Sequence, residues 1–473
     1  MAFSWFPGAC STAYTHAEES IKLPTKNGPV RALSEICKDV IPPCNLNPLL
    51  FNGHLQTAWT AIKYDGPAIH YKRRVFEQED PGFKGHFTVD FVTSAPATSG
   101  KAKDGGPEDA GLRDDPVGVG HNSLPPRTTY FTDEEFESLP SDDNKPLLIT
   151  LHGLSGGSYE TYLRHVLEPL VKATPEGEKA GGISSGNWEA LVVNSRGCAG
   201  SKITTSILYN ARATWDIRQT VKWARKTWPN RPLHGIGYSL GANILTNYLG
   251  EEGDKCLLNA AVVVSNPWKL EVSNAFLKST YIGLNVYSKT MGTNMLRLFN
   301  NHKDQVTKNT SIKTEEIEKC KYLHDFDRVV QCATDVKPDV LTRLQWGYPT
   351  EGAYYRDASS SDSVLSVRIP LLCIHAADDP IACDQAVPYA EIQQNPYAVM
   401  CATSSGGHLG WFEFGGGRWH TKPVFGFLEA MRNVDFDKIE APVFGQQGPH
   451  GGHETPFVFD PMRRRSHRPG HEH

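Results

Sequence analysis

Residues 233–249 read LHGIGYSLGANILTNYL and contain the five-residue pattern Gly-x-Ser-x-Gly, centred on Ser239. An apolar run leads into the pattern and a helix-like run follows it. A strand, a sharp turn and a helix in that order expose a serine hydroxyl at the end of the strand, as in a nucleophile elbow. Gly237 and Gly241 leave room for the close backbone approach that this turn requires. The stretch therefore predicts a nucleophilic serine at position 239.

The same five-residue pattern also surrounds Ser155 and Ser184, so the pattern alone does not select the nucleophile. Ser184 lies in a polar stretch with no strand before it and no helix directly after it, which is typical of a linker. Ser155 is the serious competitor, because it lies between an apolar run, residues 147–151, and a helical run, residues 159–173. The neighbouring sequence favours Ser239.

A serine hydroxyl is not ionised at neutral pH, so it needs a base, and the base needs a third group that orients it. Two further apolar runs lead to polar side chains, the first to Asp378 and Asp379 and the second to the glycine-flanked His408. The order serine, acid, histidine along the chain is one of the known orders of such a triad. We predict Ser239, Asp379 and His408 as the catalytic residues. Asp379 is preferred because it directly precedes Pro380, although either aspartate could reach the imidazole.

Five short blocks follow one another along the chain: residues 52–57 (NGHLQT), 151–154 (LHGL), 194–200 (NSRGCAG), 235–243 (GIGYSLGAN) and 406–410 (GGHLG). Together they resemble the fourth α/β-hydrolase family, the group of the fungal medium-chain fatty acid ethyl ester synthase/esterases and related bacterial and animal esterases. The resemblance implies the same triad, and an α/β-hydrolase fold with an N-terminal extension and a helical insert over the site. It also implies hydrolysis of short- and medium-chain acyl esters, with acyl transfer from coenzyme A to ethanol in some fungal members.

In α/β-hydrolases two backbone N–H groups hold the oxyanion, one after the nucleophile and one from the loop after the third strand. The pair His152-Gly153 opens the corresponding loop in this chain. Leu154 and Leu240 are therefore the expected donors. This places Ser155 in the oxyanion loop.

Composition excludes some classes of partner. With 48 Lys and Arg against 53 Asp and Glu, and a formal net charge of −5, the 473-residue chain gives no electrostatic reason to expect nucleic acid. No apolar run approaches the ~20 residues that span a bilayer, and the start MAFSWFP lacks a secretory signal. The expected location is intracellular and cytoplasmic, with peripheral contact at lipid droplets or organelle membranes left open. The 10 cysteines are scattered and form no Cys-x-x-Cys pair, so they support neither a metal site nor a disulfide framework. No cofactor is expected.

The pattern of apolar runs predicts an α/β fold with a mostly parallel sheet flanked by helices. Continuously apolar runs, typical of strands buried on both faces, lie at residues 146–151, 190–194, 233–238, 258–265, 370–375 and 397–403. Helical runs alternate with them at residues 159–172, 211–228, 242–250, 386–394 and 422–432. Residues 69–77 and 85–93 predict an antiparallel pair at the start of the sheet.

The domain organisation follows from composition. We expect an irregular N-terminal extension, residues 1–68, and an α/β-hydrolase domain, residues 69–435. Within the domain, residues 94–144 predict a mobile polar insertion, and residues 266–368 a helical lid region. The apolar stripe of the lid region either lines an acyl pocket or only closes the core. Residues 436–473 predict a disordered tail.

The function expected from these features is that of a serine carboxylesterase or acyltransferase acting on short- to medium-chain fatty acyl esters. The substrate would be a small-molecule acyl ester or acyl-CoA, and water or an alcohol such as ethanol would accept the acyl group from a covalent intermediate. Two alternatives remain: a monoacylglycerol or phospholipid lipase, and, from a different class, a non-catalytic lipid-binding or scaffold protein on a hydrolase fold.

Overall fold

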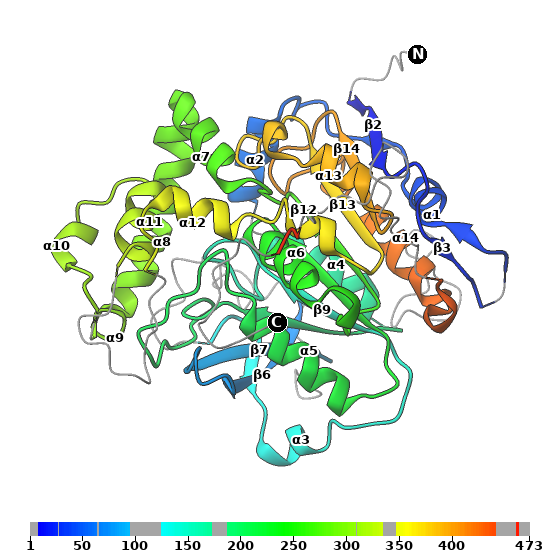
Figure 1. Cartoon of the computed structure of the whole chain (residues 1–473), viewed down its shortest axis with the longest axis horizontal. Helices are drawn as coiled ribbons and strands as arrows, with labels where there is room; N and C mark the ends of the chain where they lie inside the picture. Colours follow the sequence, from blue (N-terminus) through cyan, green and yellow to red (C-terminus); the bar gives the residue numbers. More distant parts are fainter. Residues whose placement is uncertain are drawn as a thin grey trace, which may run out of the picture.

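A single large sheet, covered by helices on both faces, organises the protein (Figure 1). The computed structural model describes residues 8–26, 28–63, 66–94, 124–172, 187–308, 310–333, 347–440 and 460–462. Within these segments the sheet has ten strands, in the spatial order β2 (Thr12–His16), β14 (Ala398–Thr403), β13 (Leu371–Ala376), β12 (Ala260–Val264), β11 (Leu233–Tyr238), β9 (Leu147–Leu151), β10 (Glu189–Asn194), β7 (His86–Thr93), β6 (His70–Glu77) and β8 (Thr128–Tyr130).

The centre of the sheet is parallel. Among the described strands, those from β14 to β10 all run in the same direction. Strand β2 pairs antiparallel with β14 at one end, and the antiparallel pair of β7 and β6 extends the other end. Every residue of β9, β11 and β12 is buried, as expected of strands covered on both faces. The predicted α/β class, with a mostly parallel sheet, is confirmed.

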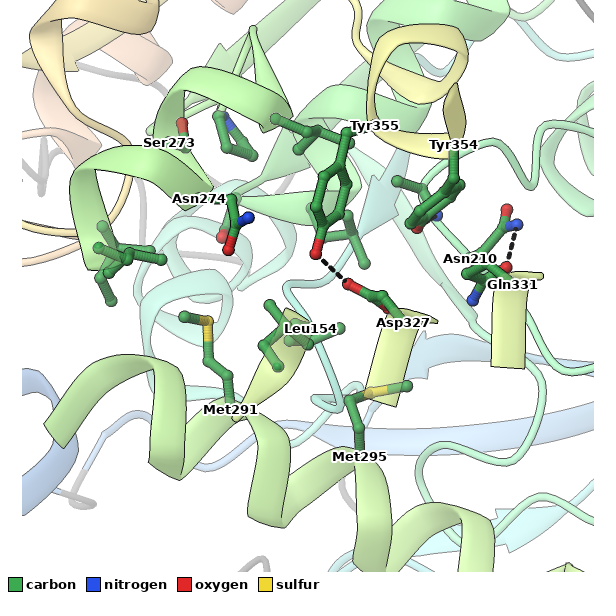
Figure 2. Close-up of a pocket in the computed structure, with 18 of the residues that line it drawn as sticks. Leu154, Asn210, Ser273, Asn274, Met291, Met295, Asp327, Gln331, Tyr354 and Tyr355 are labelled. Atoms are coloured by element: carbon green, nitrogen blue, oxygen red, sulfur yellow. Dashed lines mark hydrogen bonds between the residues drawn. The ribbon is translucent and has the colours of Figure 1, made fainter. Parts of the chain in front are cut away.

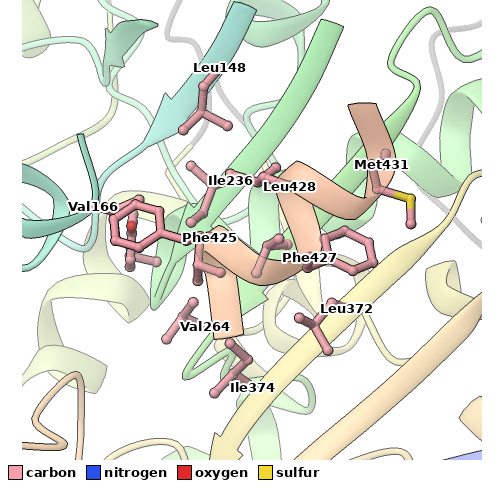
Figure 3. Close-up of a cluster of buried hydrophobic side chains, with 14 of the residues drawn as sticks. Leu148, Val166, Ile236, Val264, Leu372, Ile374, Phe425, Phe427, Leu428 and Met431 are labelled. Atoms are coloured by element: carbon pink, nitrogen blue, oxygen red, sulfur yellow. The ribbon is translucent and has the colours of Figure 1, made fainter. Parts of the chain in front are cut away.

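Helices cover both faces, and each face has its own apolar core. The described helices on one face are α1 (Leu33–Val40), α4 (Thr161–Val171) and α14 (Thr421–Arg432), and those on the other are α5 (Trp215–Thr227), α6 (Leu240–Glu252) and α13 (Tyr389–Gln394). Figure 3 shows Phe427 and Leu428 of α14 lying against Ile236 and Leu372 of the strands. Each fully buried side chain of this size stabilises the fold by about 1.5–3 kcal/mol.

The N-terminal segment is more regular than predicted. The expectation of an irregular extension at residues 1–68 is wrong for the described part, because β2 joins the central sheet and α1 packs against α14. A second helix, α2 (Gly53–Ile62), follows. Leu33, Ile36 and Cys37 give α1 a buried face with helical spacing. The elements are short, so their periodicity is weak in the sequence.

The predicted polar insertion at residues 94–144 is also partly structured. Strand β8 pairs in parallel with β6, and α3 (Asp133–Glu137) begins with a capping box at Thr132. Phe131 and Phe136 pack against Phe91 of the sheet. The expectation of a mobile segment is therefore wrong for residues 124–144. Residues 95–123, Ser184 and most of the predicted tail lie outside the described residues.

Helices occupy the segment between β12 and β13, where the sequence predicted a helical lid region. The described elements are α7 (Leu270–Ser279), the π-helical η2 (Gly283–Ser288), α8 (Lys289–Asn301), α9 (Lys303–Val306), α10 (Thr314–Ile317), α11 (Leu323–Gln331), α12 (Glu351–Ala358) and the short 3-10 helix η3 (Ser363–Ser366). They gather at the left of Figure 1, beside the sheet. The role of this region as a lid stays a prediction.

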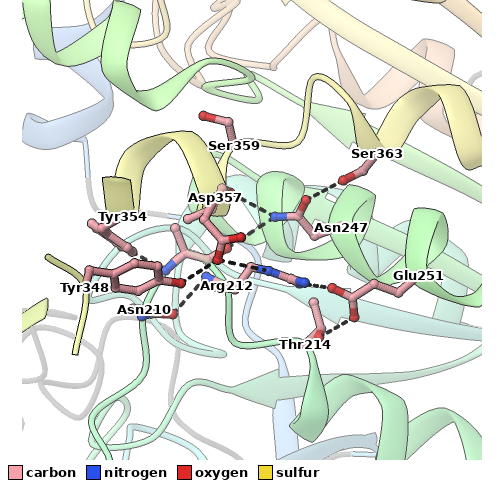
Figure 4. A network of polar contacts seen from close by, with 12 residues as sticks. Asn210, Arg212, Thr214, Asn247, Glu251, Tyr348, Tyr354, Asp357, Ser359 and Ser363 are labelled. Carbon is pink, nitrogen blue, oxygen red and sulfur yellow. Dashed lines mark hydrogen bonds and ion pairs between the residues drawn. The ribbon is translucent and has the colours of Figure 1, made fainter. Parts of the chain in front are cut away.

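A buried polar cluster ties α12 to α6 (Figure 4). Arg212 forms ion pairs with Glu251 of α6 and, at 3.6 Å, with Asp357 of α12. Asn247 of α6 donates a hydrogen bond to the carbonyl oxygen of Ala358, 2.9 Å away. Removing one member of such a buried pair typically costs about 3–5 kcal/mol, because the remaining charge loses its partner. The cluster thus fixes α12 relative to the helix that begins after Ser239.

Candidate active site

Ser239 occupies a strained turn between β11 and α6. Its φ is 51° and its ψ is −119°, a conformation that costs a non-glycine residue about 1–3 kcal/mol. A Cβ atom on Gly237 would lie 2.6 Å from the carbonyl oxygen of Gly241, and one on Gly241 would overlap the carbonyl oxygen of His152. Only glycine fits these two positions. The Ser239 N–H donates to Val264 in the next strand at 2.9 Å, which anchors the turn.

The three side chains predicted as a triad form one hydrogen-bonded chain. Ser239 Oγ lies 2.8 Å from His408 Nε2, and His408 Nδ1 lies 2.8 Å from Asp379 Oδ2. Asp379 is 2 % exposed and His408 is 8 % exposed. With a neutral imidazole, Nδ1–H donates to the carboxylate and Nε2 is free to accept the serine proton. The arrangement has the geometry that general-base activation of a serine requires.

The two adjacent aspartates have different partners. Asp379 Oδ1 also accepts hydrogen bonds from the backbone N–H groups of Ile381 and Ala382, at 2.8 and 2.9 Å. Asp378 Oδ1 accepts from the N–H groups of Gly406 and Gly407, both at 2.9 Å. The geometry therefore associates Asp379 with the imidazole, and Asp378 with the loop that carries it.

Helix α2 supports the histidine loop from the other side. The backbone N–H of His408 donates to Thr57 Oγ1 of α2 at 2.8 Å. A Cβ atom on Gly53, the first residue of α2, would overlap the backbone carbonyl oxygen of Asp378. Sequence reasoning missed Thr57, because this contact joins positions 351 residues apart. The sequence block at residues 52–57, which ends at Thr57, was the feature that could have pointed to this contact.

The predicted oxyanion donors belong to two different loops of the pocket, one after β9 and one after β11. Leu154 and Leu240 line the same pocket as Ser239. Within the described part of the chain, neither of their backbone N–H groups has a hydrogen-bond partner. The neighbouring N–H groups are used instead: Gly153 donates to Tyr162 Oη at 2.8 Å and Ser155 donates to Tyr209 Oη at 2.9 Å. Two free donors next to a serine are what an oxyanion requires.

His152 holds the same loop in place. Its Nε2 accepts a hydrogen bond from the Ser195 N–H at 3.0 Å, and its Nδ1 donates to its neighbour's carbonyl, that of Gly153, at 2.7 Å. Burial lowers the pKa of His152 to about 4, so the imidazole is neutral at neutral pH and can make both bonds. Its partners are backbone atoms, which gives His152 a structural role.

The pocket in front of Ser239 opens to solvent, and helices between β12 and β13 form much of its wall (Figure 2). Leu277 of α7 and Met291 and Met295 of α8 contribute apolar side chains. Other parts of the predicted apolar stripe do not line it. Phe299 is fully buried in the core, whereas Tyr281 is 81 % exposed. The stripe is therefore divided, because some of its residues line this pocket and others pack in the core or face solvent.

Polar side chains also line the pocket, and the sequence did not reveal them. They are Asn210, Ser273, Asn274, Asp327, Gln331 and the hydroxyl-bearing Tyr354 and Tyr355 (Figure 2). Asp327 and Gln331 look like ordinary polar positions of a surface helix. Burial, which only the tertiary structure shows, distinguishes them.

Neither a membrane-spanning helix nor a metal-binding cluster occurs in the described segments. None of the helices there combines the length and the apolar composition needed to cross a membrane. No group of three or more His, Cys, Asp or Glu side chains in those segments is arranged to hold a metal ion.

The sequence was then compared with known proteins. Residues 146–414 match the family described as alpha/beta hydrolase fold. The chain is 36 % identical over 391 residues to a monoacylglycerol lipase of Saccharomyces cerevisiae, covering 81 % of this chain and 80 % of the relative. It is 30 % identical over 399 residues to medium-chain fatty acid ethyl ester synthase/esterase 2 of the same yeast, covering 81 % of this chain and 84 % of that relative. A human phospholipase is 28 % identical over 284 residues, covering 60 % of this chain and 63 % of the relative.

The family match covers more than half of the chain, and two relatives align over most of their length. The fold, a mostly parallel sheet flanked by helices, agrees with the match. The resemblance predicted from the five sequence blocks is confirmed. The chain belongs to the α/β-hydrolase family and is a serine hydrolase related to lipases and esterases.

Proposed function

We propose that this protein hydrolyses carboxylic esters of short- to medium-chain fatty acids through a covalent acyl-enzyme on Ser239. The observation that carries the proposal is the hydrogen-bonded chain from Ser239 Oγ through His408 to Asp379, at 2.8 Å for each step. The related yeast lipase and esterase support an ester as the substrate.

In the proposed mechanism His408 Nε2 takes the proton of Ser239 as the hydroxyl oxygen attacks the ester carbonyl carbon. The backbone N–H groups of Leu154 and Leu240 stabilise the oxyanion of the tetrahedral intermediate. Asp379 keeps the imidazole in the tautomer with its proton on Nδ1 and stabilises the imidazolium. His408 then protonates the leaving alcohol oxygen. A water molecule, deprotonated by the same imidazole, releases the fatty acid and restores the serine.

The apolar wall of the pocket supports a fatty acyl substrate. The side chains of Leu277, Met291 and Met295 form an apolar surface, from which a bound alkyl chain would displace water. Burial of each methylene contributes about 0.8 kcal/mol, so a chain of roughly six to eight carbons gains several kcal/mol over acetate. Flexible methionines adapt to chains of different length.

A second reaction is supported by one relative. The yeast synthase/esterase suggests that an alcohol can replace water as the acceptor. His408 would activate the alcohol in the same way as water, so both reactions would depend on Ser239. The 36 % identity to the monoacylglycerol lipase of yeast favours a glycerol monoester as one substrate of this protein.

Active-site labelling tests the proposal. The full chain is treated with a fluorophosphonate probe, and the labelled peptide is identified by mass spectrometry. We expect labelling at Ser239, loss of labelling in Ser239→Ala, and retained labelling in the matched control Ser155→Ala. A protein that stays unlabelled would support the alternative of a non-catalytic lipid-binding scaffold. Hydrolysis of p-nitrophenyl esters of increasing acyl length then measures the chain-length preference.

A further inference from the structure

The pocket beside Ser239 has a polar side that the proposed acyl transfer does not use. Asp327 and Gln331 both come from α11 and both line the pocket, as do Met291 and Met295 of α8 (Figure 2). They are four residues apart, so they lie on the same face of the helix, one turn from each other. An alkyl chain makes no use of either group.

Asp327 is held by one partner only. Its Oδ2 accepts a hydrogen bond from Tyr355 Oη of α12 at 2.8 Å, and the residue is 7 % exposed. Over the described part of the chain, no group donates to its other carboxyl oxygen. One oxygen of a buried carboxyl group is thus available to a ligand in the pocket.

Gln331 shows the complementary arrangement. Its Oε1 accepts a hydrogen bond from Asn210 Nδ2 at 2.9 Å, and the residue is 2 % exposed. This bond orients the amide and identifies Nε2 as the donor end. The described residues provide no acceptor for Nε2. The pocket is therefore lined by an amide donor and a carboxyl oxygen from side chains one helical turn apart.

Such groups are costly when a ligand leaves them unpaired. A buried polar group without a partner costs about 1–3 kcal/mol, so a purely alkyl ligand that excludes water would pay this for each group. A hydroxyl group can donate to one and accept from the other. Burial raises the pKa of Asp327 to about 7, against the opposing effect of the Tyr355 hydroxyl, so the carboxyl group can exchange hydrogen bonds in either protonation state near neutral pH.

We propose that Asp327 and Gln331 form a hydroxyl-binding subsite, so that the protein prefers fatty acyl esters that carry a free hydroxyl group. Tyr355 and Asn210 act as positioning residues, because each orients one of the two groups. The proposal rests on the proposed ester hydrolysis. The hydroxyl can belong to the alcohol part, as in a polyol monoester, or to a hydroxylated acyl chain, and the chemistry of recognition is the same.

Three esters of the same acyl length separate these sources: ethyl octanoate, 1-octanoylglycerol and ethyl 7-hydroxyoctanoate. We expect kcat/KM of the wild-type protein for at least one hydroxylated ester to exceed that for ethyl octanoate by about tenfold or more. A preference for the glycerol ester alone places the subsite on the alcohol side. A preference for the hydroxy acid ester alone places it on the acyl side. Equal kcat/KM for all three esters would overturn the proposal.

Variants assign the preference to these residues. In Gln331→Met and Asp327→Asn we expect the ratio of kcat/KM between the preferred hydroxylated ester and ethyl octanoate to fall several-fold. The apolar control Met291→Leu should leave that ratio at its wild-type value. A ratio that stays unchanged in both polar variants would contradict the assignment. Labelling of Ser239 by the fluorophosphonate probe in each variant distinguishes loss of the subsite from failure of the proposed hydrolysis or of folding.

Discussion

Asp378 and Asp379 are adjacent in the chain, yet one carboxylate binds the backbone of the catalytic loop and the other binds the imidazole that the loop carries. Asp379 receives the Nδ1–H of His408 at 2.8 Å, whereas Asp378 receives the backbone N–H groups of Gly406 and Gly407 at 2.9 Å. A single turn after β13 thus supplies the side chain that orients the imidazole and the side chain that holds its loop. The two roles predict two different phenotypes.

Asp379→Asn should lower kcat by about 10³–10⁴-fold, because the amide stabilises the wrong tautomer of His408 and cannot stabilise the imidazolium. The matched control is Asp378→Asn, which keeps an acceptor oxygen for the loop and should mainly lower Tm. Steady-state kinetics on an octanoate ester and thermal melts measure the two effects. A larger loss of kcat in Asp378→Asn than in Asp379→Asn would show that the roles are reversed.

The contact between α2 and the acid loop predicts that Gly53→Ala reduces both stability and kcat. The added Cβ would overlap the backbone carbonyl oxygen of Asp378, so the loop that carries Asp379 must shift. Overpacking of this kind costs about 1–3 kcal/mol.

Gly417→Ala provides the control for this substitution, since the nearest atom to its new Cβ is 3.6 Å away. Urea unfolding gives the free energy of unfolding, and kinetics give kcat. If both substitutions had the same small effect, α2 would not support the acid loop.

Asp327 predicts a pH-dependent contribution to stability. Burial raises its pKa in the folded protein from 3.8 to about 7, so the folded state binds this proton more tightly than the unfolded chain. The resulting stability is complete below about pH 4 and is lost as the pH rises through about 7. Asp327→Asn removes the titration and keeps an acceptor for Tyr355. We therefore expect the Tm of Asp327→Asn, relative to wild type, to increase from acidic to mildly alkaline pH. A constant difference across this range would contradict the raised pKa.

Local sequence predicted the centre of the fold well, because the information there is local. The apolar run at residues 233–238 coincides with β11, and its Gly-x-Ser-x-Gly turn places Ser239 at the strand end. The strand pair predicted at residues 69–77 and 85–93 is observed as β6 and β7. Buried parallel strands are long apolar runs, so their positions are readable without the tertiary structure.

What the sequence did not reveal depends on contacts between distant segments. Asp378 and Asp379 are neighbours in one turn, so the sequence around them is nearly the same. Which of the two carboxylates contacts the imidazole depends on where the histidine loop lies. Strand β2 has only five residues, and its place in the sheet depends on pairing with β14. Asp327 lies in an amphipathic helix, and its burial accompanies the packing of α8 and α12 against α11.

The comparison of Ser239→Ala with Ser155→Ala tests the central claim most directly, because both serines lie in the same five-residue pattern and each follows a strand of the central sheet. The measurement is kcat/KM for p-nitrophenyl octanoate, with circular dichroism to show that each variant is folded. We predict a loss of about 10⁴-fold or more in Ser239→Ala and near wild-type turnover in Ser155→Ala. Turnover that survives in folded Ser239→Ala and disappears in Ser155→Ala would contradict the assignment of the nucleophile.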